Sequence, residues 1–221
     1  MLVQTQPKLT HIYAFVEDDF DTPINSPVTF INVSDYKSIT ENQTNNNSHW
    51  TYMVLTRCYF TELLPNVDKI LYLDLDIMIT EDISEIWEID IDNYAIAGVI
   101  DSGVNTQFVP YIWDKANYIN VGAILMNLKY LRESGLDKEI DKLLRSYFLR
   151  FPDQDAINMA CYGHIKNIDY KWNSSDATTI SEHPKINHVI RTKPWNPNSK
   201  WFPQWAMNYL KTGAKQSINQ F

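Results

Sequence analysis

The segment Lys69 to Ile79, KILYLDLDIMI, is a nearly continuous apolar run that contains two aspartates one residue apart. Continuous runs of Ile, Leu and Tyr at this length are typical of strands that are buried on both faces. A second such run, YAIAGVI, covers Tyr94 to Ile100. Because helices must cover both faces of a sheet built from such strands, the two runs predict an α/β fold with a mixed, mostly parallel sheet.

Helical segments separate these strands. From Trp50 onward apolar residues are spread over all faces of a buried helix, and Pro65 marks its end. Residues 137–149 have apolar residues at helical spacing, which predicts an amphipathic helix. Another helix is expected to begin at Pro152, because proline suits the first helical position and aspartates follow it in the first turn.

The remaining segments are shorter. Residues 118–136, YINVGAILMNLKYLRESGL, are predicted to begin extended, turn at Gly122 and finish as a helix that stops at Gly135. A polar loop is expected at residues 40–49, TENQTNNNSH. Further short strands are predicted at residues 11–19, 28–33, 164–172 and 185–190.

Composition limits the organisation of the chain. With 221 residues, 44% of them hydrophobic, the chain can bury one full core. We therefore expect a single domain over residues 1–205, followed by a C-terminal helix or tail over 206–221. The net charge is −8 without a Lys/Arg block, which argues against nucleic acid as a partner. Two cysteines without metal-type spacing, and no signal-peptide pattern, indicate a cytoplasmic protein with buried thiols and at most peripheral membrane contact.

Asp74 and Asp76 are the first candidates for chemistry. In a strand, residues i and i+2 point to the same side, so their carboxylates are expected to converge. An isolated pair of this kind is most often a solvated strand end. Here apolar residues flank both sides, and buried like charges need a shared proton or cation. A divalent cation that prefers oxygen ligands, magnesium or manganese, is the partner that these residues favour.

Other polar residues are less specific by themselves. Arg57 lies among apolar neighbours and needs an anionic partner, either a carboxylate or a ligand phosphate. His188 alone is more often structural, whereas Lys193 nearby has the charge to meet a phosphate. Asp153, Gln154 and Asp155 stand at a helix start, where acids favour the helix dipole, and we assign Asp155 to that structural role.

Five segments, in the same order, resemble glycosyltransferase family 8, the retaining nucleotide-sugar transferases with a GT-A fold. The resemblance runs from about His11 to Trp205, and it rests on YMVLTRCYFTELLP, DKILYLDLDIMITEDISEIW, YINVGAILMNLKYLRE, FPDQDAINMACYGHIKNIDYKWN and INHVIRTKPWN. It implies a Rossmann-type α/β domain that transfers a hexose, glucose or galactose, from a UDP-sugar.

The resemblance also implies roles for individual residues. Asp74, Asp76 and His188 would ligate Mn²⁺ or Mg²⁺, which would bridge the donor diphosphate. Arg57 and Lys193 would meet phosphate or donor-sugar oxygens. The residues expected to hold the transferred sugar are Asp101, Asn120, Asp153 and Gln154.

The candidate catalytic residues are Gln154 and Asp153. Gln154 is expected to face the anomeric carbon, either as a weak nucleophile or as a support for front-face attack by the acceptor. We favour the second role, because an amide is a poor nucleophile.

Two departures from the family pattern stand out. Arg191 takes the place of a glycine after His188, and Lys193 follows the histidine by five residues instead of six. Residues 11–20 resemble the first strand of the family, but the run through residues 28–36 into the arginine helix fits its second and third strands better. On that alignment the first strand and most of the first helix, which hold the nucleotide base, are expected to be missing. We therefore expect weak or no binding of the nucleotide sugar, and a sheet edge that a partner chain could complete.

The expected function is extension of a bacterial cell-surface glycan or of a glycan on a protein. Two alternatives remain open: a non-catalytic nucleotide-sugar or glycan-binding remnant of such an enzyme, and a metal-dependent phosphohydrolase that uses the same aspartates.

Overall fold

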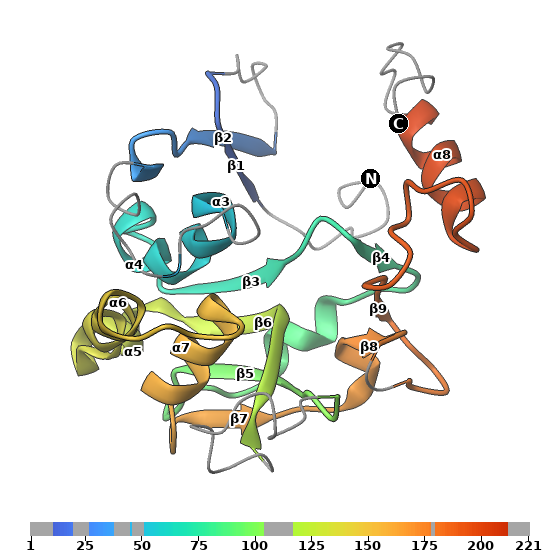
Figure 1. The fold of residues 1–221 in the computed structure, drawn as a ribbon. Coiled ribbons are helices and arrows are strands. Elements are labelled where there is room, and N and C mark those ends of the chain that lie inside the picture. The colour runs from blue at the N-terminus through green and yellow to red at the C-terminus, as the bar shows by residue number, and fades with distance from the viewer. Residues whose placement is uncertain are drawn as a thin grey trace.

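The computed structural model describes residues 11–19, 27–37, 45, 51–103, 117–177 and 180–211, with the backbone alone for 209–211. The strands of this part form three sheets (Figure 1). A two-stranded sheet contains β1 (Ile12–Val16) and β2 (Val28–Asn32). The four-stranded sheet has the order β3 (Lys69–Leu73), β6 (Ile119–Asn127), β5 (Ile96–Ile100) and β7 (Ile165–Asn167). The third sheet has the order β4 (Ile77–Ile79), β9 (Ile186–His188) and β8 (Ser174–Ser175).

The α/β class with sheets flanked by helices is confirmed, but the strand directions differ from the prediction. Among the described strands, three pairings are parallel and three are antiparallel, so the four-stranded and three-stranded sheets are mixed, and the pairings are not mostly parallel. The reason lies in the connection from β5 to β6. Ile119 pairs with Ile100, so the chain re-enters the sheet at the end where β5 stops and must run antiparallel to it.

The helix predicted from Trp50 to Pro65 is divided. It consists of α3 (Tyr52–Leu55), the 3₁₀ helix η1 (Thr56–Tyr59) and α4 (Phe60–Leu63). The other helices follow the predicted pattern more closely, and they are α5 (Leu128–Ser134), α6 (Leu136–Ser146) and α7 (Pro152–Ala160). Two further 3₁₀ helices are η2 (Ser84–Glu88) and η4 (Tyr170–Trp172), so the strand predicted at 164–172 ends early.

Gly122 does not turn the chain out of the sheet, as the sequence pattern predicted. β6 continues through it, and the register against β5 shifts at this point: Gly98 pairs with Ile124, whereas Val99 pairs with Asn120. The extra residues of β6 bulge there, which explains why a glycine stands in the interior of this strand. The predicted helix stop is confirmed, because Gly135 has the left-handed backbone conformation with φ 74°.

The main core lies between the four-stranded sheet and the helices. Ile96, Ile119 and Ile124 of the sheet are fully buried with Leu144 of α6 and Ile157 of α7. The two-stranded sheet packs on the same core through Phe15, which stacks on Phe60, and Phe60 in turn contacts Tyr72 of β3. In the part of the chain that the structure describes, β3 is an edge strand. That a partner chain completes an edge of the sheet stays a prediction.

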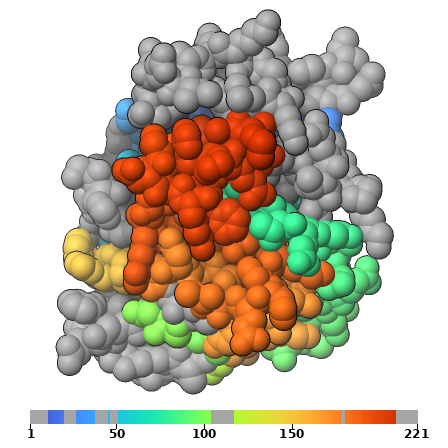
Figure 2. Space-filling view, turned by 90° about the vertical axis from the view of Figure 1, so that its right-hand side faces the viewer, coloured from blue at the N-terminus to red at the C-terminus, as the bar shows by residue number. Residues whose placement is uncertain are grey.

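The last segment includes α8 (Phe202–Lys211), which runs through the boundary predicted at residues 205 and 206. Figure 2 shows this C-terminal segment on one face of the molecule, beside the region of β4. No helix among the described residues has the length and apolar character needed to span a membrane. The predicted polar loop at 40–49 lies outside the described residues except for Asn45, which is buried and hydrogen-bonds to the backbone of Leu144, Tyr147 and Leu149.

Candidate active site

The two aspartates lie in the short connection between β3 and β4, not inside one strand. The backbone N–H of Asp74 donates to Gly122 O at 2.8 Å, which attaches the connection to β6. The carbonyl of Asp76 accepts from the N–H of Val189 at 3.0 Å, which attaches it to the segment after β9. His188 ends β9 opposite Ile77. Strand pairing therefore brings residues that are more than a hundred positions apart to one place.

Three ligand atoms converge there. His188 Nε2 lies 3.3 Å from Asp76 Oδ1 and 3.7 Å from Asp74 Oδ2. The ligand atoms of the three side chains all lie within 4.8 Å of one another. The other oxygens of the two carboxylates are already bonded: Asp74 Oδ1 accepts from Arg57 Nη2 at 2.8 Å and from the Tyr72 hydroxyl, and Asp76 Oδ2 pairs with Lys193 Nζ. Each carboxylate thus presents one oxygen to the same point.

Asp76 is held in its charged form. Burial by itself acts to raise its pKa, but the contacts with His188 and with the Lys193 ammonium outweigh burial and lower the pKa to about 2. The side chain is only 9% exposed, whereas that of Lys193 is 42% exposed. A buried carboxylate beside an accessible ammonium is suited to bind a cation on one side and an anion on the other.

Arg57 has the anionic partners that the sequence required. Its Nη2 bonds Asp74, and its Nε lies 3.1 Å from Asp153 Oδ2. The guanidinium also donates to Val121 O at 3.3 Å and stacks over the Tyr72 ring with 4.5 Å to the centroid. Burial raises the pKa of Asp153 above its ordinary value, although the Arg57 charge opposes this shift. The arginine therefore links the β3–β4 connection to the first turn of α7.

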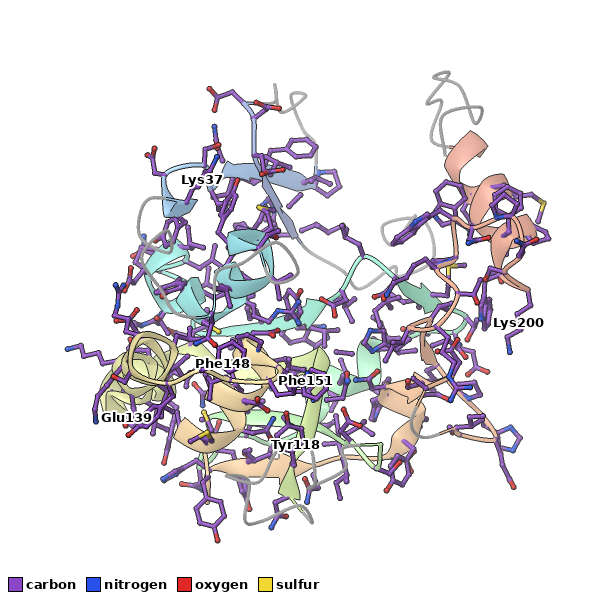
Figure 3. The ribbon with its side chains drawn as sticks, viewed as in Figure 1. Lys37, Tyr118, Glu139, Phe148, Phe151 and Lys200 are labelled. Atoms are coloured by element: carbon purple, nitrogen blue, oxygen red, sulfur yellow. The ribbon has the colours of Figure 1, made fainter. Side chains whose placement is uncertain are left out.

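A second cluster, which we call the amide cluster, connects β6 to α7. Its members are Asp101, Tyr118, Asn120 and Gln154. Gln154 Nε2 donates to Asp101 Oδ2 at 3.1 Å and to the Tyr118 hydroxyl at 3.2 Å. Gln154 Oε1 accepts from the Val121 N–H at 3.2 Å and from Asn120 Nδ2 at 3.3 Å. Both ends of the Gln154 amide are thus occupied, and Tyr118, which is labelled in Figure 3, is buried.

The position of α7 is set by side chains that face β6. Asn158 accepts from the Ile119 N–H at 2.8 Å and donates to the Ile119 carbonyl at 2.9 Å. Asp155 accepts from the Tyr118 hydroxyl at 2.5 Å and from the Phe151 N–H at 2.8 Å. The structural role predicted for Asp155 is therefore confirmed, since its carboxylate fastens the start of the helix.

Gly122 lies directly against the carboxylate and imidazole groups. A Cβ atom built on Gly122 would lie 2.1 Å from His188 Cε1 and 2.8 Å from Asp74 Oδ2. Both distances are far shorter than van der Waals contact, so the bulged backbone of β6 forms one wall of the cluster.

The residues present fit a divalent cation. Two carboxylates and an imidazole are ligands that Mg²⁺, Mn²⁺ and related ions accept, and metal–oxygen distances of about 2.0–2.6 Å can join the three groups. The charge balance agrees, because the carboxylates of this connected set exceed its permanent cations Arg57 and Lys193.

All the candidate residues from the sequence belong to one network of contacts. Arg57 joins Asp74 to Asp153, and His188 and Lys193 meet at Asp76. Asn173 connects the two halves: its side chain bonds His188 Nδ1 at 3.2 Å and Asn120 Oδ1 at 2.9 Å. The members of this network are Arg57, Asp74, Asp76, Asp101, Asn120, Asp153, Gln154, Asn173, His188 and Lys193.

Sequence reasoning missed Tyr72, Tyr118 and Asn173, and it gave Gly122 a different role. Asn173 follows a tryptophan near the end of the family-like block, and an amide in that position carries no charge signal. The loop around Arg191 is anchored by Asp176, whose Oδ1 accepts from the N–H groups of Ile190 and Arg191. Arg191 itself is exposed.

Comparison with known proteins agrees with this geometry. The family model described as "Glycosyl transferase family 8" matches residues 5–199. General stress protein A of Bacillus subtilis is 25% identical over 205 residues, which cover 79% of this chain and 72% of that protein. Lipopolysaccharide 1,2-glucosyltransferase of Escherichia coli is 25% identical over 191 residues, 76% of this chain and 55% of the enzyme.

A putative glycosyltransferase of Haemophilus influenzae is 28% identical over 123 residues, which cover 53% of this chain and 37% of that protein. The chain thus spans less than two thirds of several relatives. Galactosyltransferase LgtC, solved with donor and acceptor sugar analogues, superposes with a TM-score of 0.71 at 20% identity, covering 98% of this chain and 90% of LgtC. That structural likeness shows a GT-A fold, and the family match over most of the sequence establishes that the chain belongs to glycosyltransferase family 8.

Proposed function

We propose that this chain transfers a hexose, glucose or galactose, from a UDP-sugar to a glycan or glycoprotein acceptor, with retention at the anomeric carbon and dependence on Mn²⁺ or Mg²⁺. One observation carries the proposal: Asp74 Oδ2, Asp76 Oδ1 and His188 Nε2 converge while the outer carboxylate oxygens are bonded to Arg57 and Lys193. A bound divalent ion would supply Lewis-acid stabilisation of the charge that develops on the UDP leaving group.

The protein's own cations would act on the same charge. Lys193 is half-exposed and ends beside Asp76, so its ammonium is placed to meet a phosphate oxygen next to the cation site. Arg57 is buried and paired with two carboxylates, which fix the orientation of its guanidinium. It is therefore less able than Lys193 to move toward a bound phosphate. We assign Lys193 to the diphosphate, and Arg57 to fixing Asp74 and the donor-sugar side.

The transferred sugar would lie against the amide cluster. Asp101, Asn120 and Gln154 are joined by hydrogen bonds of 3.1–3.3 Å and are held by backbone groups of β6. Because Gln154 Oε1 already accepts two hydrogen bonds, we assign Gln154 to supporting front-face attack by the acceptor, not to nucleophilic attack. Asp153 stays a candidate catalytic group, although its bond to Arg57 favours a positioning role. Among related structures, LgtC has also been solved with an active-site glutamine changed to glutamate.

Release of UDP from a panel of UDP-sugars tests this proposal. We expect Mn²⁺-dependent release from UDP-glucose or UDP-galactose, measured over a wide donor concentration range because donor binding is expected to be weak. The variant Asp76→Asn should lose the activity by at least about 100-fold, since it removes one ligand charge. Asp92→Asn is the matched control, because Asp92 is exposed and the substitution changes the net charge equally.

The alternatives give different outcomes in the same assay. Phosphate release from simple phosphate esters without UDP release would indicate a phosphohydrolase. Binding of UDP-sugar without turnover would indicate a binding module. Equal activity of Asp76→Asn and Asp92→Asn would contradict the proposed site.

The proposed location is the cytoplasm, with at most peripheral contact at the inner face of the membrane. The two cysteines, Cys58 and Cys161, are buried free thiols, which suits a reducing compartment. The acceptor we propose is a bacterial surface glycan or a glycan on a protein.

A further inference from the structure

Two backbone N–H groups of β6 determine how a series of side-chain amides is oriented. The N–H of Val121 donates to Gln154 Oε1 at 3.2 Å, and the N–H of Gly122 donates to Asn120 Oδ1 at 3.0 Å. A backbone N–H can only donate, so each of these side-chain atoms must be the amide oxygen. The orientation of Asn120 is fixed a second time, because its Nδ2 faces the Asp101 carboxylate at 3.3 Å.

This orientation is passed on to Asn173. The oxygen of Asn120 can accept but cannot donate, so the Asn173 group that faces it at 2.9 Å must be Nδ2. The opposite end of the Asn173 amide is then Oδ1, and it faces His188 Nδ1 at 3.2 Å. An amide oxygen is an acceptor only, so the imidazole must carry a proton on Nδ1.

We propose that Asn173 is a positioning residue that holds the proton of His188 on Nδ1, so that the lone pair of Nε2 points at the cation site between Asp74 and Asp76. We name Asn120 and Asn173 the amide relay, and its source is the backbone of β6 at Gly122. The inference deepens the proposed function, because it rests on His188 as a ligand in the cation site. Metal-binding histidines commonly have their second ring nitrogen fixed by such a partner.

The competing arrangement is a proton on Nε2 that donates to Asp76 Oδ1, 3.3 Å away. It would leave the Nδ1 lone pair opposite Asn173 Oδ1. Turning the Asn173 amide would move the mismatch to its contact with Asn120. Turning the Asn120 amide as well would place its NH₂ group, a donor, against the donor N–H of Gly122, and its oxygen, an acceptor, against the Asp101 carboxylate. Asn173 is 2% exposed and His188 is 5% exposed, so water has little access to relieve such a mismatch.

Long-range ¹H–¹⁵N correlation spectra of the metal-free protein test the inference directly. They distinguish protonated from unprotonated ring nitrogens, and His188 is assigned among the five histidines by comparison with His188→Gln. In spectra in which the His188 imidazole is neutral, wild type is expected to show protonated Nδ1 and unprotonated Nε2. A wild-type spectrum with protonated Nε2 and unprotonated Nδ1 would overturn the proposal.

Substitutions along the relay separate positioning from packing. Asn173→Ala removes the acceptor, so His188 should change to the Nε2–H form and the affinity for Mn²⁺ alone should fall about 10–100-fold. Asn173→Asp keeps an acceptor and should retain the Nδ1–H form. Asn167→Ala is the control, because it removes an amide–amide bond to Asn117 that is outside the relay, and it should change neither readout.

A third variant acts without touching His188. Asn120→Ala frees the Asn173 amide to turn, and it should weaken the preference for Nδ1–H; this variant replaces Asn173→Ala if the latter does not fold. Unchanged spectra and unchanged Mn²⁺ affinity in a folded Asn173→Ala would overturn the relay. Failure of the proposed function is distinguishable: an Nδ1–H spectrum in a wild type that does not bind Mn²⁺ would contradict the cation site and leave the relay intact.

Discussion

At Gly122 the backbone of β6 approaches His188 and Asp74 so closely that no side chain fits between them. The Cβ of an alanine there would lie 2.1 Å from Cε1 of the buried His188, so the strand or the imidazole would have to shift. Gly122→Ala is therefore expected to displace His188 and to abolish Mn²⁺ binding in a titration of the metal alone, while the protein keeps its secondary structure by circular dichroism.

Gly135→Ala is the matched control for this prediction. Gly135 has φ 74° and open space around the position of a Cβ, so alanine there costs about 1–2 kcal/mol of folding free energy through backbone strain. Its Mn²⁺ affinity should equal that of wild type. If Gly122→Ala binds Mn²⁺ as tightly as Gly135→Ala, the claim that the backbone at Gly122 leaves no room for a side chain beside the cation site is wrong.

Arg57 supports a second prediction at the residue scale. Its buried guanidinium neutralises the carboxylates of Asp153 and Asp74, so Arg57→Met leaves negative charge without a partner. This substitution should lower the free energy of unfolding, measured by urea denaturation, by about 3–5 kcal/mol. Arg145→Met, which removes an exposed pair with Asp141, should cost less than about 1 kcal/mol. Adding Asp153→Asn to Arg57→Met should recover part of the loss, and equal losses for the two single variants would refute this ranking.

At this scale the sequence was informative where charge stands among apolar residues. Asp74, Asp76 and Arg57 were recognisable because buried charge needs a partner: Arg57 pairs with Asp74, and Asp76 pairs with Lys193. Asn173 was not recognisable, since a neutral amide can find hydrogen-bond partners in many environments and does not require a charged one. Its importance depends on contacts with Asn120 and His188, which are distant in the sequence.

At the scale of elements, the divided helix at residues 52–63 shows where local patterns stop being sufficient. No proline or glycine interrupts this segment, so the sequence predicted one helix. The hydroxyl of Thr56 bonds the carbonyl of Tyr52, and the Arg57 side chain bonds that of Val54 while it reaches Asp153. These side-chain bonds compete with regular helical geometry. In contrast, α6 and the starts and stops at Pro152 and Gly135 were predicted, because they depend on residues within a few positions.

The contact between η1 and α6 gives a pH-dependent prediction. Asp141 accepts hydrogen bonds from Tyr59 at 2.8 Å and from Arg145 Nε at 2.8 and 2.9 Å. Burial acts to raise the pKa of Asp141, but these partners outweigh it and hold the pKa below its ordinary 3.8. A carboxylate with a lowered folded pKa stabilises the fold above its unfolded pKa, and that stabilisation is lost as the pH falls through the folded pKa.

The measurement is urea unfolding of wild type and Asp141→Asn at a series of pH values. Wild type is expected to be more stable by a constant amount near neutral pH, and the difference should shrink below pH 3.8. Asp92→Asn serves as the control for net charge. A difference between wild type and Asp141→Asn that stays constant down to the lowest pH would show that Asp141 does not act through its charge.

At the scale of the whole molecule, the site exists because the connection from β3 to β4 passes from one sheet to another. β3 belongs to the four-stranded sheet and β4 pairs with β9 in the three-stranded sheet, so the connection that contains Asp74 and Asp76 joins the two sheets. Figure 1 shows this connection between β3 and β4. His188 is brought there by β9 and Gly122 by β6. The family resemblance predicted which residues meet, but strand directions and the bulge in β6 follow from tertiary pairing that local patterns do not encode.

The most direct test is a crystal structure of the protein with Mn²⁺, in which anomalous scattering locates the ion. We predict one strong anomalous peak within about 2.0–2.3 Å of Asp74 Oδ2, Asp76 Oδ1 and His188 Nε2, with Lys193 still beside Asp76. The peak should be absent from crystals of Asp76→Asn grown in the same way. A Mn²⁺ peak elsewhere, or none at these three side chains in a folded wild-type protein, would contradict the account.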